Sequence, residues 1–242
     1  MNFTVAPHRV AIADARTSRG DPSLEREGFQ LIAHKSVISS LPSIEEIEQR
    51  YLPESEQLLR EIAGTPQVHV FASGLRFNER SEHSGSRPNS RPARRVHSDF
   101  SDEGAREVVA RAFGTGTEVP SGGYYRAYNL WRVLSAPPQD TPLALCDMRS
   151  VRIEDRITAE GIVAIAGRPE FHYEFCLYRY DPAQRWWYFR DMHRDEALVF
   201  LGYDSRATER RVPHCAFDDP SCPQGVAPRI SIEVRAVAYF PA

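Results

Sequence analysis

Short segments rich in β-branched and aromatic residues fill the chain from Gly122 to its end. Pro, Gly and Asp residues separate these segments, and residues 231–239 alternate in part between polar and apolar side chains. This pattern predicts an all-β architecture. It is consistent with a double-sheet jelly roll of the cupin kind, the double-stranded β-helix. The expected strands span residues 124–134, 143–151, 161–166, 172–180, 186–189, 197–203 and 230–240.

The N-terminal half is expected to contribute helices. Ser43 and Glu46 form a capping-box pattern, in which the Ser side chain accepts from a free backbone N–H and the Glu side chain reaches back. The helix after it is expected to break or restart at Pro53 and to end at Gly64. A second helix is predicted over 103–113, and short strands over 29–32 and 68–71.

We expect these helices to pack on one outer face of the jelly roll. The whole chain, residues 1–242, is expected to form a single domain, because no internal repeat or second core is evident. Its mixed N-terminal part reaches to about residue 115, and the jelly-roll strands begin at about residue 120.

The composition is ordinary for a soluble globular protein. Hydrophobic residues make up 41% and charged residues 26%, and the formal net charge is −3. We therefore expect no nucleic-acid or membrane partner, since the one basic concentration is the short stretch 87–95. The four Cys residues lack the C-x-x-C spacing of a zinc site and are expected to be reduced. No signal segment and no apolar run of membrane-spanning length is evident, so a cytoplasmic protein is expected.

Two His residues and one Asp residue form the most informative functional pattern. His97 and Asp99 are two apart, so on a strand both side chains point to the same face. His214 lies far downstream and would return on another strand of the jelly roll. Two imidazoles and a carboxylate are the ligands of the facial triad that holds Fe(II) and leaves positions open for a co-substrate and oxygen. The sequence therefore predicts a metal site at His97, Asp99 and His214.

Two alternatives remain open for these residues. His97 can lie in a surface loop while His214 is a hydrogen-bonded core residue, because a His-x-Asp pattern arises by chance in many chains. His193, in Met192-His-Arg-Asp195, is the other candidate ligand.

An Arg and a Ser follow the second His. The guanidinium of Arg229 can hold a carboxylate through two charge-assisted hydrogen bonds, and Ser231, two residues on, can add a third. We therefore expect Arg229 and Ser231 to bind the far carboxylate of 2-oxoglutarate. Arg235 competes for this role, since it shares the face of Ser231 but lies deeper along the strand.

Residues 78–95 are polar and rich in Ser, Pro and Arg. We expect the stretch to be a solvated loop. The alternative is a mobile lid that helps to bind an anionic substrate, and the position directly before His97 supports that alternative.

Several motifs resemble one group of iron- and 2-oxoglutarate-dependent oxygenases. That group contains the fungal gibberellin-desaturase type, the cephamycin-pathway methoxylation component and fungal meroterpenoid-tailoring enzymes. The similarity extends from about Phe29 to Phe240. The motifs that carry it are Tyr128-Asn-Leu-Trp-Arg132, Pro142-Leu-Ala-Leu-Cys-Asp147, Trp187-Tyr-Phe189, Tyr203-Asp-Ser205, Pro213-His-Cys-Ala-Phe217 and Pro228-Arg-Ile-Ser-Ile-Glu-Val-Arg235.

The resemblance implies a site and a chemistry. It makes His97, Asp99 and His214 the iron ligands, with Arg229 and Ser231 as the 2-oxoglutarate clamp. By looser analogy with plant oxygenases, Asn129 lies near the iron-bound end of the co-substrate. Trp131, which can equally be a core aromatic residue, points its indole N–H at the far carboxylate.

Tyr125 and Arg126 are candidate substrate contacts, although Arg126 fits a structural ion pair equally well.

The function implied is hydroxylation or desaturation of a small-molecule natural-product intermediate, with Fe(II), 2-oxoglutarate and O2 and with release of succinate and CO2. One alternative is a cupin-like metalloenzyme that does not use 2-oxoglutarate. Another is a non-catalytic partner of a second biosynthetic enzyme. The sequence leaves open whether the chain forms a homo-oligomer.

Overall fold

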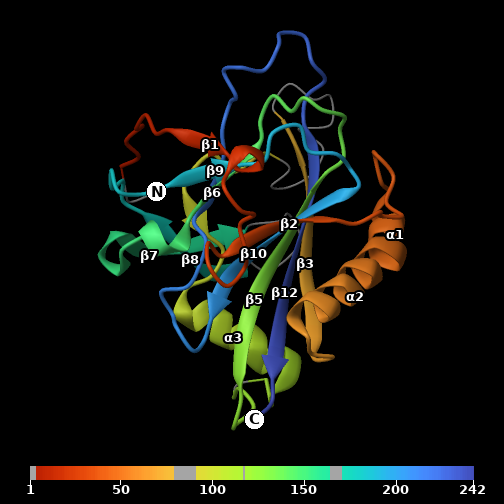
Figure 1. Cartoon of the computed structure of the whole chain (residues 1–242). Helices are drawn as coiled ribbons and strands as arrows, with labels where there is room; N and C mark the ends of the chain where they lie inside the picture. Colours follow the sequence, from red (N-terminus) through yellow and green to blue (C-terminus); the bar gives the residue numbers. More distant parts are fainter. Residues whose placement is uncertain (1–3, 79–90, 117, 164–170) are drawn as a thin grey trace.

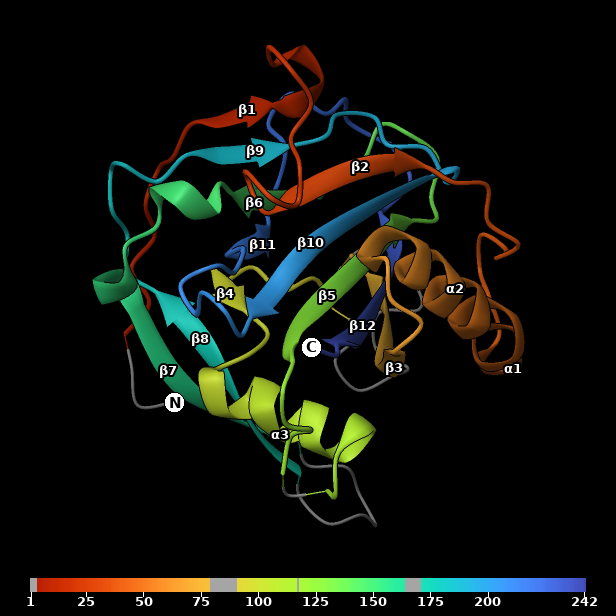
Figure 2. The ribbon, with the colours of Figure 1, turned by 60° about the horizontal axis from the view of Figure 1, so that its bottom comes forward.

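Two β-sheets form the body of the molecule in a computed structural model that describes residues 4–78, 91–116, 118–163 and 171–242. Five strands make one sheet, in the spatial order β2 (Phe29–Ala33), β10 (Glu196–Asp204), β5 (Tyr124–Val133), β12 (Ile230–Phe240) and β3 (Val68–Phe77). Seven strands make the other sheet, in the order β1 (Ile12–Asp14), β9 (Trp186–Tyr188), β6 (Leu143–Cys146), β11 (His214–Ala216), β4 (His97–Ser98), β8 (Phe171–Tyr178) and β7 (Arg156–Val163). Figure 1 and Figure 2 show both sheets from two directions.

All pairings within the five-stranded sheet are antiparallel. In the other sheet, β1 and β9 run parallel and the remaining pairs are antiparallel. Since strands from distant parts of the sequence are neighbours, His97 and His214 become direct partners across β4 and β11. The all-β prediction is confirmed, because both sheets are made chiefly of the predicted segments.

The helix predicted after Ser43 begins at the expected residue, and a π-helical turn interrupts its α-helical hydrogen bonding. It consists of α1 (Ile44–Glu46), the π-helical turn η2 (Ile47–Tyr51) and α2 (Leu52–Ala63). The Ser43 side chain accepts a hydrogen bond from the Glu46 N–H. The Glu46 carboxylate accepts from the N–H and hydroxyl of Ser39, and it also interacts with the Ser43 N–H, as the capping box predicted. Gly64 ends the helix with φ at 70°, a left-handed conformation that favours glycine.

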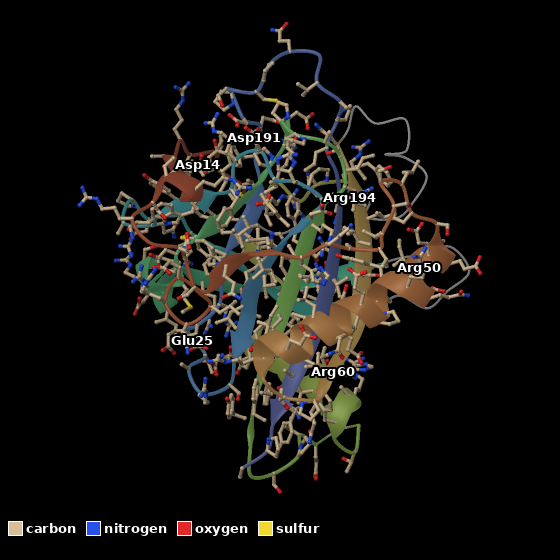
Figure 3. All side chains as sticks on the ribbon, turned by 45° about the vertical axis from the view of Figure 1, so that its right-hand side comes forward. Asp14, Glu25, Arg50, Arg60, Asp191 and Arg194 are labelled. Carbon is tan, nitrogen blue, oxygen red and sulfur yellow. The ribbon has the colours of Figure 1, made fainter. Side chains whose placement is uncertain are left out.

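The two long helices contact β12 from opposite faces. Alternate side chains of a strand point to opposite sides of the sheet. The even-numbered residues of β12, such as Ile232 and Val234, belong to the apolar core that contains Leu58 and Leu59 of α2. Val237 instead packs with Ala105 and Val109 of α3 (Asp102–Phe113). Figure 3 shows the helix that carries Arg50 and Arg60 lying across the five-stranded sheet. The expectation that both helices share one outer face is therefore wrong for α3.

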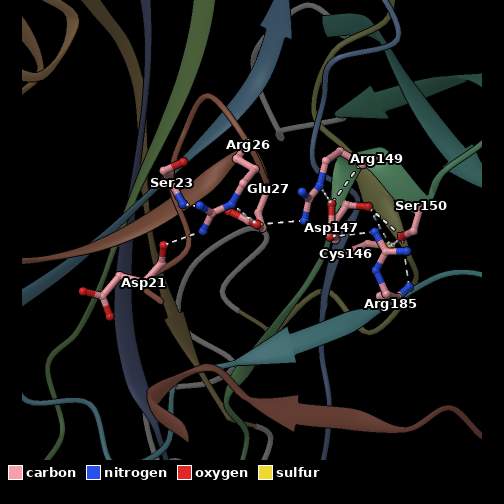
Figure 4. Close-up of polar contacts among 9 residues, drawn as sticks. All are labelled: Asp21, Ser23, Arg26, Glu27, Cys146, Asp147, Arg149, Ser150 and Arg185. Carbon is pink, nitrogen blue, oxygen red and sulfur yellow. Dashed lines mark hydrogen bonds and ion pairs between the residues drawn. The ribbon is translucent and has the colours of Figure 1, made fainter. Parts of the chain in front are cut away.

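Strand β6 is shorter than predicted, because the chain turns at Asp147. The Asp147 carboxylate accepts from the Arg149 N–H at 3.0 Å and starts the short helix η3 (Met148–Ser150), which is followed by η4 (Ile153–Asp155). Asp147 also accepts from the guanidinium groups of Arg149 and Arg185, at 2.8 and 2.9 Å. Arg149 reaches Glu27 at 2.8 Å, so these ion pairs attach the N-terminal segment to the seven-stranded sheet (Figure 4).

Candidate iron and 2-oxoglutarate site

The structure brings His97, Asp99 and His214 together. One potential ligand atom from each residue lies within 4.8 Å of the others, and no other such cluster of three occurs in the described parts of the chain. His97 Nε2 is 3.7 Å from Asp99 Oδ1, and His214 Nε2 is 3.6 Å from Asp99 Oδ2. All three side chains face the five-stranded sheet, with His97 and His214 on paired strands and Asp99 just after β4.

Backbone carbonyls orient both imidazole rings. His97 Nδ1 lies 2.8 Å from the Arg95 carbonyl and His214 Nδ1 lies 3.1 Å from the Val212 carbonyl. If each Nδ1 carries the proton, each Nε2 presents its lone pair toward Asp99, as in metal sites where the second ring nitrogen donates to a carbonyl. His214 Nε2 is buried and has no hydrogen-bond partner among the described residues. A buried acceptor without a partner is costly, so this donor set fits a metal ion.

The protonation states also suit metal binding. Burial, and next the neighbouring His214, lower the pKa of His97 to about 4. His97 is therefore neutral at pH 7, which is the form that coordinates a metal. Burial alone would raise the pKa of Asp99, but Arg235, His214 and His97 together hold it below its usual range.

Arg229 is a buried cation that packs on Trp131, on the face of the five-stranded sheet that carries Asn129. Its residue is 2% exposed, its Nη1 donates to Ser231 Oγ at 2.6 Å, and its Nε has no hydrogen-bond partner. Among the residues that the structure describes, no carboxylate forms an ion pair with its guanidinium. Burial lowers the pKa of Arg229 to about 10, which still leaves a cation at neutral pH. An unpaired, desolvated guanidinium fits an anionic ligand such as a carboxylate.

Trp131 and Asn129 follow the alternation of β5 and face the same side as the site. The Trp131 ring lies under the Arg229 guanidinium, 5.5 Å from its carbon to the ring centre. Asn129 donates from Nδ2 to Asp99 Oδ2, and its Oδ1 has no partner in the described structure. Asn129 thus contacts the carboxylate expected to hold iron, a contact that sequence reasoning did not anticipate.

The two expected substrate contacts, Tyr125 and Arg126, both have partners within the protein. Arg126 points to the opposite face of β5 and pairs with Asp204 at 2.8 Å and Glu25 at 2.5 Å. This geometry favours the structural ion pair that the sequence left open. Tyr125 stacks on Tyr203, with ring centres 5.7 Å apart, in the apolar cluster beneath α3.

The alternative ligand His193 and the alternative clamp residue Arg235 do not occupy the roles that the sequence left open for them. His193 is exposed and lies outside the cluster, in the segment before β10. Arg235 forms an ion pair with Asp99 at 2.6 Å and does not join Arg229. Residues 79–90 of the suggested lid lie outside the described residues.

Comparisons with known proteins agree with this geometry. The family described as "Oxidoreductase/YMDC permease-like domain" matches residues 1–239. Within the described parts, every helix is too short or too polar to cross a membrane. The hydroxylase/desaturase poxK of Penicillium oxalicum is 28% identical, with 98% of this chain and 81% of that protein covered.

The Fe(II)/2-oxoglutarate-dependent dioxygenase nvfI of Aspergillus novofumigatus is also 28% identical, with 98% of this chain and 85% of that protein covered. A solved structure of the iron- and α-ketoglutarate-dependent endoperoxidase NvfI superposes with a TM-score of 0.83 at 26% identity, covering 100% of this chain and 89% of that one. The chain therefore belongs to the oxidoreductase/YMDC permease-like family and, within it, to the iron- and 2-oxoglutarate-dependent oxygenases.

Proposed function

We propose that His97, Asp99 and His214 hold Fe(II) and that Arg229 with Ser231 binds the far carboxylate of 2-oxoglutarate. One observation carries the proposal: three ligand atoms converge around the unpartnered Nε2 of His214, beside a buried guanidinium that lacks a carboxylate partner. A divalent cation would coordinate the three converging ligand atoms, and the far carboxylate of 2-oxoglutarate would pair with the buried guanidinium.

When bound, iron and 2-oxoglutarate supply the oxidising chemistry, in which O2 is consumed and succinate and CO2 are released. The protein contributes binding, orientation and exclusion of water. The carbonyls of Arg95 and Val212 fix the two imidazole rings. The Ser231 hydroxyl, 0% exposed as a residue, holds the Arg229 guanidinium against Trp131 in a site closed to bulk water.

The substrate is a small-molecule natural-product intermediate, and the reaction is a hydroxylation, a desaturation or a related oxidation. The names of the relatives support this range, since they include hydroxylase/desaturase and endoperoxidase. Two sheets that hold the site between them support assignment to the jelly-roll class. A single domain, a cytoplasmic location and a homo-oligomer or partner enzyme stay predictions.

An anaerobic titration tests the proposal. Metal-free protein receives Fe(II) and then 2-oxoglutarate, and the weak visible charge-transfer band of the chelate is recorded. We expect the band only after both additions, and we expect it to be lost in His97→Ala, which lacks an iron ligand. Arg229→Ala should need far more 2-oxoglutarate. His193→Ala is the matched control, because this exposed His lies outside the cluster, and it should behave like the wild type.

Two results would contradict the proposal in different ways. Metal binding without a band, at any concentration of 2-oxoglutarate, would indicate a cupin-like enzyme that does not use this co-substrate. Failure to bind metal would indicate a non-catalytic partner protein.

A further inference from the structure

Side chains of the five-stranded sheet hold both oxygens of Asp99. Arg235 Nη2 lies 2.6 Å from Oδ1, and Asn129 Nδ2 donates to Oδ2. Asn129 and Arg235 are direct partners across β5 and β12, so one rung of the sheet supplies both donors. The Asp99 side chain is 4% exposed, which keeps water from competing for these contacts.

A second carboxylate fixes Arg235 in place. Glu233 precedes Arg235 by two residues on β12, so both side chains point to the same face. Glu233 Oε1 lies 2.7 Å from the same Nη2 that reaches Asp99, and the Glu233 side chain is 12% exposed. Glu233, Arg235 and Asp99 thus form a continuous chain that ends at the triad.

We propose that Arg235 is a positioning residue for the iron ligand Asp99, and that Glu233 holds Arg235 in that role. The inference rests on the proposed function, because it requires Asp99 to be a metal ligand. With one donor on each oxygen, the carboxylate plane is fixed while each oxygen keeps a lone pair for the metal. Groups that orient a metal ligand in this way commonly contribute a factor of about 10–100 to metal affinity.

Two effects of the guanidinium oppose each other. Its charge repels a metal cation, which weakens binding, and its hydrogen bond orients Asp99, which strengthens binding. Without Arg235, the buried carboxylate would also lose its cationic partner and would turn toward other donors. We expect orientation to dominate, so that removal of Arg235 weakens metal binding.

Binding of Co(II), an iron surrogate with visible ligand-field bands, tests the inference without 2-oxoglutarate or substrate. Arg235→Met should bind Co(II) about 10–100-fold more weakly than the wild type and show altered bands. Arg235→Lys should recover part of the affinity, because an ammonium group can still donate to Asp99. Glu233→Gln should give a smaller loss, since the Arg235–Asp99 pair remains.

Arg132→Met is the matched control. Arg132 is a 0% exposed Arg on β5 whose guanidinium donates to the His34 and Arg194 carbonyls on the opposite face of the sheet. The variant should lose stability and retain the wild-type Co(II) affinity. Folding of every variant is checked by circular dichroism before titration.

Equal or tighter Co(II) binding by Arg235→Met would overturn the inference, because charge repulsion would then outweigh orientation. A loss of the same size in Arg132→Met would also overturn it, since the effect would reflect general destabilisation. If the wild type binds no Co(II), the proposed function fails together with the inference. If the wild type binds and Arg235→Met matches it, the inference alone fails.

Discussion

At the scale of single residues, Arg229 shows how an unpaired charge indicates a ligand. Burial of a cation costs several kcal/mol unless an anion compensates it. The Arg229 guanidinium contacts Ser231 and Trp131, and the nearby Asp140 carboxylate accepts from the Arg229 backbone N–H and forms no ion pair with the guanidinium in the described structure. Arg235, six residues along, is partly buried and pairs with two carboxylates. This difference in partners supports the proposal that Arg229 binds an anion whereas Arg235 orients Asp99.

Arg229→Ala should raise the 2-oxoglutarate concentration required for half-maximal formation of the charge-transfer band about 100-fold. Loss of a buried, charge-assisted pair costs about 3 kcal/mol, and each factor of ten corresponds to about 1.4 kcal/mol. Ser231→Ala should raise it about tenfold, because one neutral contact is lost. Unchanged requirements in both variants would move the clamp to another residue.

The pKa of His97 makes stability depend on pH. The pKa of His97 is about 4 in the folded chain, whereas the ordinary value is 6.5. Between these two pH values, His97 is therefore protonated in the unfolded chain and neutral in the folded chain. The free energy of unfolding of metal-free protein should therefore fall as the pH drops from about 6.5 toward 4. Between pH 7 and pH 5, His97 should account for a loss of about 2 kcal/mol.

Urea unfolding of metal-free protein at pH 7 and pH 5 measures this effect. His97→Gln removes the titrating group, so its stability should change less between the two pH values than that of the wild type. An identical change in both proteins would show that His97 is not buried in its neutral form.

At the scale of elements, α3 is attached to the seven-stranded sheet at its first turn. Ser101 caps the helix, because its Oγ accepts from the Gly104 N–H at 2.9 Å, and its hydroxyl donates to Glu174 of β8 at 2.7 Å. Gly104 lies so close to β8 that an added Cβ would be 2.9 Å from the Glu174 carbonyl oxygen. The helix that follows Asp99 is therefore joined to the seven-stranded sheet through these two positions.

Ser101→Ala should lower the free energy of unfolding by about 1–2 kcal/mol, because the helix loses its N-cap and the Glu174 carboxylate loses a donor. Ser101→Thr keeps the hydroxyl and should lose less. Thermal unfolding followed by circular dichroism measures both. A loss in the Thr variant as large as that in the Ala variant would assign the effect to packing around Ser101.

The type of a helix or strand could be predicted where it depends on residues close together in the sequence. The elements and side chains that pack against it could not be predicted. The β-branched segments, the Ser43 cap and the Gly64 stop follow from side-chain chemistry within a few residues. The face on which α3 packs depends on how β12 alternates against two layers, which the helix sequence does not encode. Arg235 was placed on the correct face by its spacing from Ser231, but its partner Asp99 depends on how the two sheets oppose each other.

At the scale of the whole molecule, ion pairs between buried carboxylates and half-exposed Arg side chains connect segments that are distant in sequence. Asp147 is 1% exposed and accepts hydrogen bonds from Arg149 and Arg185, while Arg149 reaches Glu27 near the N-terminus. These contacts form the network of Figure 4, and none of its hydrogen bonds and ion pairs involves His97, Asp99 or His214. They therefore stabilise the fold without contacting the site.

Asp147→Ala should lower the free energy of unfolding by about 1–3 kcal/mol, because the Arg149 N–H and two guanidinium groups lose their common acceptor. Co(II) affinity should stay at the wild-type value. Glu103→Ala is the control, because it breaks only an exposed pair with Arg106. It should change neither the free energy of unfolding nor the Co(II) affinity measurably. A drop in metal affinity in the Asp147 variant would show that this network also supports the triad.

The two halves of the site rest on strands of very different length. The proposed ligands His97 and His214 lie on β4 and β11, which have two and three residues. The proposed clamp residues Arg229 and Ser231, and Arg235, lie on or directly before β12, which has eleven residues. Short strands open locally more often than long central ones. Amide protons near His97 and His214 should therefore exchange with deuterium rapidly in metal-free protein and slowly once metal joins the two strands. Amide protons of β12 should exchange slowly in both the metal-free and the metal-bound protein. The proposed anion-binding residues on β12 would then be ordered before metal binds, whereas β4 and β11 would become ordered only when metal binds.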